Sequence, residues 1–180
     1  MSRIGKAPIA IPKGVDVKFD REVVRVKGPK GELVSRIPAG ISVSVADGQV
    51  LFARNNDEPQ QRAFHGLLRS LVANSVEGVT KGFTKELEIV GVGYKAEVKG
   101  KSVVFALGYS HPINFAIPDG ISVALDAKAG KLTISGADRQ KVGQTAAEIR
   151  SLRVPDPYKA KGIKYSNEII RRKVGKAGGK

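Results

Sequence analysis

The sequence predicts an α+β protein of two tandem, structurally similar domains, each a small antiparallel sheet packed on one helix, plus a basic C-terminal extension. Three observations support this fold class: an internal repeat, a run of strand patterns ending in a helical pattern within each copy, and a concentration of positive charge near the end of the chain. We expect an N-terminal domain at residues 1–82, a C-terminal domain at 83–153 and the extension at 154–180.

The internal repeat has an offset of 80 residues. VVRVKGPKGELVSRIPAGISV (23–43) matches VVFALGYSHPINFAIPDGISV (103–123) at nine of 21 positions. After one inserted residue, the match continues from 51–71 to 132–152, and both segments end in Arg-Ser-Leu. Agreement that crosses from strands into a helix favours two copies of one structural unit over two convergent hairpins.

Each copy alternates apolar strand patterns with turn residues. In the first copy, GPKG (28–31) and Pro38-Ala39-Gly40 are expected turns, and the expected strands are 23–26, 33–37, 41–45 and 50–53. In the second copy, LEIVGVGYKAEV (87–98) opens the sheet, Pro118-Asp119-Gly120 is a turn, and further strands are expected at 121–125 and 132–134. The order of elements is therefore the same in both copies.

A helical pattern closes each copy, because apolar residues recur there at spacings of three and four. The expected core-facing stripe of the first helix is Phe64, Leu67, Leu68, Leu71, Val72 and Val76, and that of the second is Val142, Ala146, Ile149 and Leu152. Asn56 or Asp57 precedes the first helix and Ala137 or Asp138 the second, and an Asp there would supply an N-cap oxygen.

Positive charge is concentrated near the end of the chain. The net charge is +14, of which residues 150–180 supply +8 with ten basic and two acidic side chains. A strongly basic segment indicates a polyanionic partner. The N-terminus lacks the apolar core of a secretory signal and no apolar stretch is long enough to span a membrane, so no membrane partner is expected.

The sequence offers no convincing catalytic or metal-binding set, so we expect neither an enzyme nor a cofactor. There are no cysteines, and the two histidines, His65 and His111, lie 46 positions apart. His65 is expected to lie at the surface or to pack against other side chains. Glu86 and Glu88 share one strand face, which is expected to be solvated. GVGYKA (91–96) lacks the third glycine of a dinucleotide fingerprint and lies between strands.

The extension begins with Val154-Pro155-Asp156-Pro157, which cannot propagate a helix. We expect the following segment, Tyr158–Gly162, to be extended, with Lys159 and Lys161 on one side and Tyr158 and Ala160 on the other. Gly162 allows a close backbone approach, and Lys164 with Tyr165 repeats the pairing of a cation with an aromatic ring. Lysine neutralises phosphates, and tyrosine stacks on bases.

The end of the extension has two expected parts. Residues 167–174 are expected to form a short helix with Ile169, Ile170 and Val174 docked and with Arg171, Arg172 and Lys173 exposed. GKAGGK (175–180) is expected to be disordered until it binds a partner. A solvated basic tail and a membrane-surface segment are the alternatives, and the second lacks a broad apolar face.

Several of these motifs resemble one known family. PDPYKAKGI (155–163) is similar to the characteristic segment of bacterial-type ribosomal protein six of the large subunit. SRIGKAPIAIP near the start, GVGYKA, GYSHPI, GADRQKVGQ and the final RRKVGKAGGK fit the same family, so the resemblance covers essentially the whole chain.

The resemblance implies a structural protein of the cytoplasmic ribosome that binds large-subunit ribosomal RNA through its C-terminal domain and tail. It places the protein near the sarcin–ricin loop and the stalk base, beside neighbouring ribosomal proteins, and it implies no homo-oligomer. The RNA-contacting segment of the family carries over to Pro155, Tyr158, Lys159, Lys161 and Gly162. The charge pattern adds Lys164, Tyr165, Arg171, Arg172, Lys173 and Lys176, and two loops add Tyr94, Lys95, Ser110 and His111.

A free-standing regulatory nucleic-acid binder or RNA chaperone would share the basic tail and is the alternative from another class. An enzyme acting on nucleotides is the third hypothesis, and it lacks an acid–base, nucleophilic or metal set.

Overall fold

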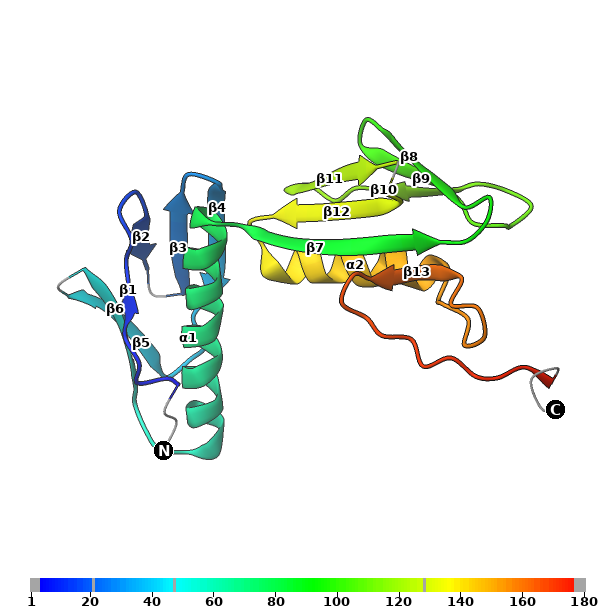
Figure 1. Ribbon diagram of the computed structural model, residues 1–180. Helices are drawn as coiled ribbons and strands as arrows, with labels where there is room; N and C mark the ends of the chain where they lie inside the picture. The colour runs from blue at the N-terminus through cyan, green and yellow to red at the C-terminus, as the bar shows by residue number, and fades with distance from the viewer. Residues whose placement is uncertain (1–3, 21, 47, 128, 177–180) are drawn as a thin grey trace. The chain divides into compact units, whose positions relative to one another are not determined.

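The computed structural model describes residues 4–20, 22–46, 48–127 and 129–176. Contacts divide the chain into two compact units, Met1–Gly82 with Ala137–Arg139, and Phe83–Gly136 with Gln140–Lys180. Each unit combines small antiparallel sheets with one helix (Figure 1). The predicted α+β class with two similar units is confirmed.

The first unit contains two three-stranded antiparallel sheets and the helix α1, Pro59–Thr80. One sheet has the order β2-β3-β4 and the other β1-β6-β5. The strands are β1 Ile9–Ala10, β2 Asp16–Phe19, β3 Val23–Gly28, β4 Gly31–Arg36, β5 Ile41–Ala46 and β6 Gln49–Arg54.

The second unit contains a three-stranded sheet, a four-stranded sheet and the helix α2, Arg139–Leu152. The sheet orders are β10-β9-β8 and β11-β12-β7-β13, and all pairings are antiparallel. The strands are β7 Phe83–Val90, β8 Lys95–Lys99, β9 Ser102–Ala106, β10 Ile113–Ala116, β11 Ile121–Asp126, β12 Lys131–Gly136 and β13 Gly162–Tyr165.

The structure reproduces the repeat seen in the sequence. The hairpin of β3 and β4 corresponds to that of β9 and β10, and the hairpin of β5 and β6 to that of β11 and β12. In each unit the buried apolar faces of the strands meet one helix. The two cores centre on Val24, Val26, Val50, Leu68 and Val72 in the first unit, and on Leu87, Phe105, Leu132, Ile149 and Ile163 in the second.

The buried stripe of α1 differs in part from the prediction. Leu68, Val72 and Val76 are buried as expected, whereas Leu67 is 51% exposed and Leu71 38% exposed. Successive helical residues are rotated by about 100°, so a stripe that includes His65, Ser75 and Val79 on one side leaves Leu67 and Leu71 on the other. The prediction that Leu67 and Leu71 face the core is therefore wrong. In α2, Val142, Ala146 and Ile149 are buried, as predicted.

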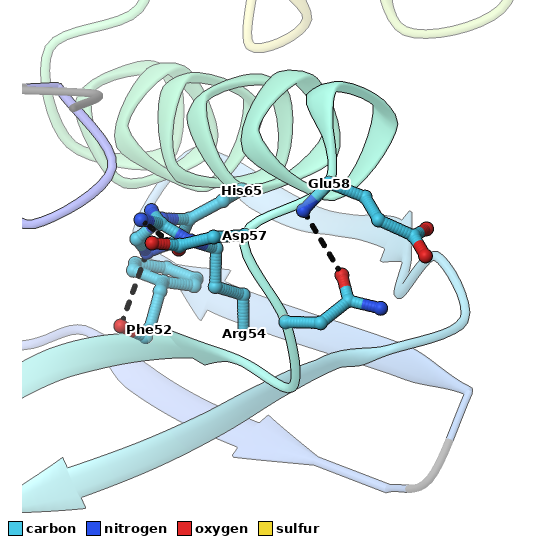
Figure 2. Close-up of polar contacts among 6 residues, drawn as sticks. Phe52, Arg54, Asp57, Glu58 and His65 are labelled. Carbon is cyan, nitrogen blue, oxygen red and sulfur yellow. Dashed lines mark hydrogen bonds and ion pairs between the residues drawn. The ribbon is translucent and has the colours of Figure 1, made fainter.

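The start of α1 is held without a side-chain N-cap. The cap residue is Glu58, which makes no capping hydrogen bond, and Pro59 follows it. The Asn56 side chain accepts a hydrogen bond from the Glu58 amide at 3.3 Å, and Asp57 instead pairs with Arg54 at 2.6 Å (Figure 2). Neither Asn56 nor Asp57 is the cap, because Pro59 lacks an amide hydrogen and moves the helix start onward.

His65 is a packing residue rather than a catalytic one. It is 2% exposed, and its Nε2 lies 3.1 Å from the Phe52 carbonyl oxygen (Figure 2). Its Nδ1 lies 3.1 Å from Arg54 Nη1, and arginine is only a donor, so Nδ1 is the acceptor and Nε2 carries the hydrogen. The two contacts tie α1 to β6, which agrees with the expected packing role.

Candidate nucleic-acid interface

The extension folds back onto the second unit after α2. Its residues Gly162–Tyr165 form β13, which pairs antiparallel with β7, and Ile163 is fully buried in the core. The Ile163 amide also donates to the Arg153 carbonyl at 2.8 Å. Basic side chains of this segment are therefore presented from a fixed backbone.

Asp156 organises the turn that precedes β13. Its carboxylate accepts hydrogen bonds from the amides of Tyr158 and Lys159 at 2.8 Å each and of Lys161 at 2.9 Å. The amides of Lys159, Lys161 and Tyr158 hold the pKa of Asp156 below its ordinary value, because they stabilise the charged form. The prediction that residues 158–161 are extended with alternating sides is therefore wrong: the chain turns around this carboxylate.

The close approach predicted at Gly162 is internal to the protein. A Cβ built there would lie 2.7 Å from both the Arg153 carbonyl oxygen and the Pro155 nitrogen, and the φ of Gly162 is +147°. Two residues before it, Ala160 is buried at a φ of 56°, in the left-handed region. Gly162 thus closes the turn against the residues that follow α2.

Glu168 fastens the chain after β13. Its two carboxylate oxygens accept hydrogen bonds from Arg150 of α2, with Nε at 2.8 Å from Oε2, and Oε2 also accepts from the Tyr165 amide at 3.2 Å. The Arg150 side chain lowers the pKa of Glu168, and Glu168 in turn raises that of Arg150. The Arg150 guanidinium carbon lies 5.9 Å from the Tyr165 ring centroid.

The predicted helix at 167–174 is absent. Glu168 is drawn back to Arg150, and the Lys173 amide donates to the Pro157 carbonyl at 2.8 Å, which a helical path would not allow. Ile169 is 91% exposed and Val174 78% exposed, so the prediction that they dock is also wrong. Arg171, Arg172 and Lys173 are exposed as expected, and residues 177–180 of the basic terminus lie outside the described residues.

Lys164 and Tyr165 lie in β13 and have internal contacts. Lys164 pairs with Glu88 of β7 at 2.8 Å and lowers the pKa of that carboxyl, while Glu86 is exposed. Tyr165 packs against the core of the second unit. Of the predicted cationic residues of the extension, the exposed ones are Lys159, Lys161, Arg171, Arg172, Lys173 and Lys176.

Two loops lie at the same end of the second unit as the Asp156 turn (Figure 1). The loop after β7 contains Tyr94, Lys95 begins β8 directly after it, and Gly162 pairs with Val90 at the end of β7. The loop between β9 and β10 contains Ser110 and His111, both exposed. The Tyr109 hydroxyl of this loop donates to the Leu152 carbonyl at the end of α2, at 3.1 Å.

Sequence reasoning missed two residues at this end of the unit. The Arg153 guanidinium carbon lies 4.8 Å from the Tyr109 ring centroid. The side chain of Tyr109, and next that of Tyr94, raise the pKa of Arg153, because both interact favourably with the charged guanidinium. One sequence signal could have indicated Arg153: it lies directly after the helical pattern and before Val154-Pro155. Nothing in the sequence pairs it with Tyr109, which lies 44 positions earlier.

The described residues contain no candidate metal centre. Among them, no group of three or more His, Asp or Glu side chains could hold a metal ion. None of the helices in the described part of the chain has the length and apolar character needed to cross a membrane.

Exposed cations on a fixed backbone, with tyrosines beside them, are typical of non-enzymatic nucleic-acid-binding proteins. The model of the family "Ribosomal protein L6" matches residues 11–82 and 90–166. The chain is 58% identical to large ribosomal subunit protein uL6 of Koribacter versatilis, over the full length of both chains. It is 56% identical to the protein of that name from Nitratidesulfovibrio vulgaris and 54% identical to that from Maridesulfovibrio salexigens, with at least 99% of each chain covered.

The chain therefore belongs to the ribosomal protein L6 family. Members of this family are structural constituents of the large subunit in the cytoplasmic ribosome and are not enzymes. This finding confirms the resemblance and the expected absence of an enzymatic role.

Proposed function

We propose that this protein binds large-subunit ribosomal RNA through its second unit and its basic extension. The resemblance supports a site beside the sarcin–ricin loop and near the stalk base, where translation factors bind and where other ribosomal proteins are its neighbours. A single copy acts in the particle. In this proposal, residues 1–82 and 83–153 form two rigid domains, and residues 154–180 form the extension that binds RNA.

The observation that carries the proposal is the opposite use of acidic and basic side chains in residues 154–176. Both acidic residues there, Asp156 and Glu168, are bound to backbone amides or to Arg150. Lys159 and Lys161 project from the turn that Asp156 holds, and the cations that follow Glu168 are exposed. The two carboxylates are thus used to hold the fold of the extension. The outward surface that remains is almost purely cationic, and such a surface attracts phosphates.

The proposed contact residues differ in role. The side chains that meet RNA are Tyr158, Lys159, Lys161, Arg171, Arg172, Lys173 and Lys176. Pro155, Gly162, Lys164 and Tyr165 contribute through the shape of the turn and of β13, where they border the RNA surface. Tyr94, Lys95, Ser110 and His111 extend the surface across the two loops.

The test replaces Lys159 and Lys161 with Gln and measures equilibrium binding to a large-subunit ribosomal RNA transcript at several salt concentrations. Each lost phosphate contact should reduce the slope of log affinity against log salt by about 0.7–0.9, so the double variant should lose about 1.4–1.8. Thermal stability should change little, because both side chains are exposed.

A matched control removes the same charge from the first unit, at the exposed residues Lys13 and Lys27. It should leave the slope almost unchanged. An equal loss in both double variants would mean that only net charge matters and would contradict a site in the extension.

A further inference from the structure

Tyr109 and Arg153 form a stacked pair beside the proposed RNA surface. Tyr109 lies in the β9–β10 loop and Arg153 directly follows α2, with the guanidinium carbon 4.8 Å from the ring centroid. The Tyr109 hydroxyl is engaged with the Leu152 carbonyl, and the Arg153 carbonyl accepts the Ile163 amide. Both residues are therefore fixed at one end to the backbone of the second unit.

Tyr109 as a residue remains 44% exposed, although its hydroxyl already donates a hydrogen bond within the protein. What Tyr109 offers to a partner is therefore mainly its flat aromatic surface. A lone phosphate gains little from such a surface, whereas a nucleobase stacks on an aromatic ring or on a guanidinium plane. Because the ring is fixed before binding, stacking would cost little conformational entropy.

The surroundings favour the same ligand. Tyr158, which is 56% exposed, and the exposed Lys159 belong to the turn that follows Arg153, and the exposed Lys95 is the first residue of β8. Asp156, the acidic residue nearest to Arg153 in sequence, is occupied by three backbone amides. A flat stacking surface on a unit that also presents these exposed cations matches a base that has left a helical stack and carries a phosphate on either side.

We propose that the Tyr109–Arg153 pair is a stacking site for one unpaired nucleobase of the bound RNA. The inference rests on the proposed function and adds a selectivity: this end of the protein recognises RNA at an interruption of a helix, such as a bulge, loop or end. The phosphates of a continuous duplex would contact the cations, but no base of the duplex would stack on the Tyr109–Arg153 pair.

The first experiment irradiates intact large subunits that contain the full chain at about 254 nm and maps protein–RNA crosslinks by mass spectrometry. Short-wavelength light joins aromatic side chains to stacked bases, so a nucleotide adduct on Tyr109 is expected. Adducts on peptides of residues 154–176 without one on Tyr109 would overturn the stacking site and leave the proposed function intact. Particles in which neither region is crosslinked would count against both.

The second experiment compares three variants in binding to the large-subunit RNA transcript. Tyr109→Leu and Arg153→Lys should each weaken binding by about tenfold or more, with the salt slope unchanged, because stacking and not a phosphate contact is lost. Tyr109→Phe retains the ring and should retain most of the affinity. Arg25→Lys, on the solvated face of β3, is the matched control and should bind like the parent chain.

Loss of salt slope in Arg153→Lys, or full affinity in Tyr109→Leu, would overturn the proposal. Circular dichroism and thermal unfolding of each variant establish that the second unit is folded. If Tyr109→Leu unfolds at a lower temperature than the parent, Arg153→Lys decides the test, because it preserves the hydrogen bond of the Tyr109 hydroxyl.

Discussion

Arg69 and Arg150 occupy equivalent positions in the two Arg-Ser-Leu segments of the repeat, and each holds a terminal segment of the chain. Arg69 donates to the carbonyls of Ala7 and Pro8 at 3.2 and 3.4 Å, and Arg150 pairs with Glu168. The arginine at this position of the repeat therefore fastens the N-terminal segment in the first unit and the basic extension in the second.

Replacing Asp156 with Ala distinguishes two influences on RNA affinity, the folded turn of the extension and the net charge. The change raises the net charge by one, so an account based on charge alone predicts tighter RNA binding. We predict weaker binding by several-fold, because the amides of Tyr158, Lys159 and Lys161 lose their acceptor and the turn must be ordered by RNA. Titration with the RNA transcript measures the difference.

The control for this prediction is Asp119→Ala, which makes the same charge change at a side chain that is 95% exposed. It should bind equally well or slightly better. Tighter binding by Asp156→Ala than by Asp119→Ala would show that the turn has no part in recognition.

Glu168→Gln should destabilise the second unit by about 1–2 kcal/mol near neutral pH, because charge-assisted bonds to Arg150 are lost. The pKa of Glu168 in the folded protein lies below its ordinary value, chiefly because of the hydrogen bonds from Arg150, so its stabilisation is present above the ordinary pKa and is lost as the pH falls through the folded pKa. Urea unfolding should show a gap between parent and variant at about pH 7 that narrows at about pH 3. A gap that stays constant with pH would contradict the ion-pair explanation.

At the scale of elements, the two helices differ where the sequence repeat stops. The helix α1 continues to Thr80, whereas α2 ends at Leu152, after which Pro155 and Pro157 exclude helix. The segment released from the helix forms the Asp156 turn and β13. The second unit therefore has the Asp156 turn and an extra strand, β13, where the first unit has the last turns of α1.

Gly162→Ala should damage this arrangement. The added Cβ would clash with the Arg153 carbonyl at 2.7 Å, so β13 must shift away from β7, at a cost of about 2–3 kcal/mol in the free energy of unfolding. RNA affinity should fall with it. Gly143→Ala is the matched control: its Cβ meets nothing within 4 Å in α2, so a stabilisation of about 1 kcal/mol is expected. Equal effects of the two changes would refute the close approach at Gly162.

Glu58→Ser should stabilise the first unit by about 1 kcal/mol, since Glu58 is the N-cap of α1 and makes no capping bond. A serine hydroxyl would accept one of the free amides of the first turn. The same substitution at Gln60, inside the helix, should instead cost a few tenths of a kcal/mol. Chemical denaturation of both variants checks the assignment, and a gain at Gln60 without one at Glu58 would contradict it.

Much of the fold follows from local patterns, because strand alternation, turn residues and the helical stripe of α2 all act within a few residues. The sequence did not reveal β13, because its partner strand β7 lies more than 70 positions earlier and Tyr158–Tyr165 also reads as an exposed basic segment. Arg150–Glu168 and Tyr109–Arg153, which lie 18 and 44 positions apart, also join residues that no single local pattern covers. The exposed lysines and arginines were predictable, since their charge alone keeps them at the surface.

At the scale of the whole molecule, the charge distribution separates the two tasks of the chain. Residues 1–149 carry a net charge of +6 over two domains, from 21 basic and 15 acidic side chains, and residues 150–180 carry +8. In the second unit, the fold secures the cationic extension through β13, Asp156 and Glu168. The central claim is that this secured cationic surface attaches the protein to RNA.

The most direct test of that claim replaces six exposed cations with Gln in the full chain: Lys159, Lys161, Arg171, Arg172, Lys173 and Lys176. Large subunits assembled with this variant or with the parent are washed at increasing salt, and the protein that remains bound is measured. We predict that the variant is released at much lower salt and that its salt slope falls by about four to five when all six meet phosphates. Retention at the same salt as the parent, with an unchanged slope, would contradict the claim.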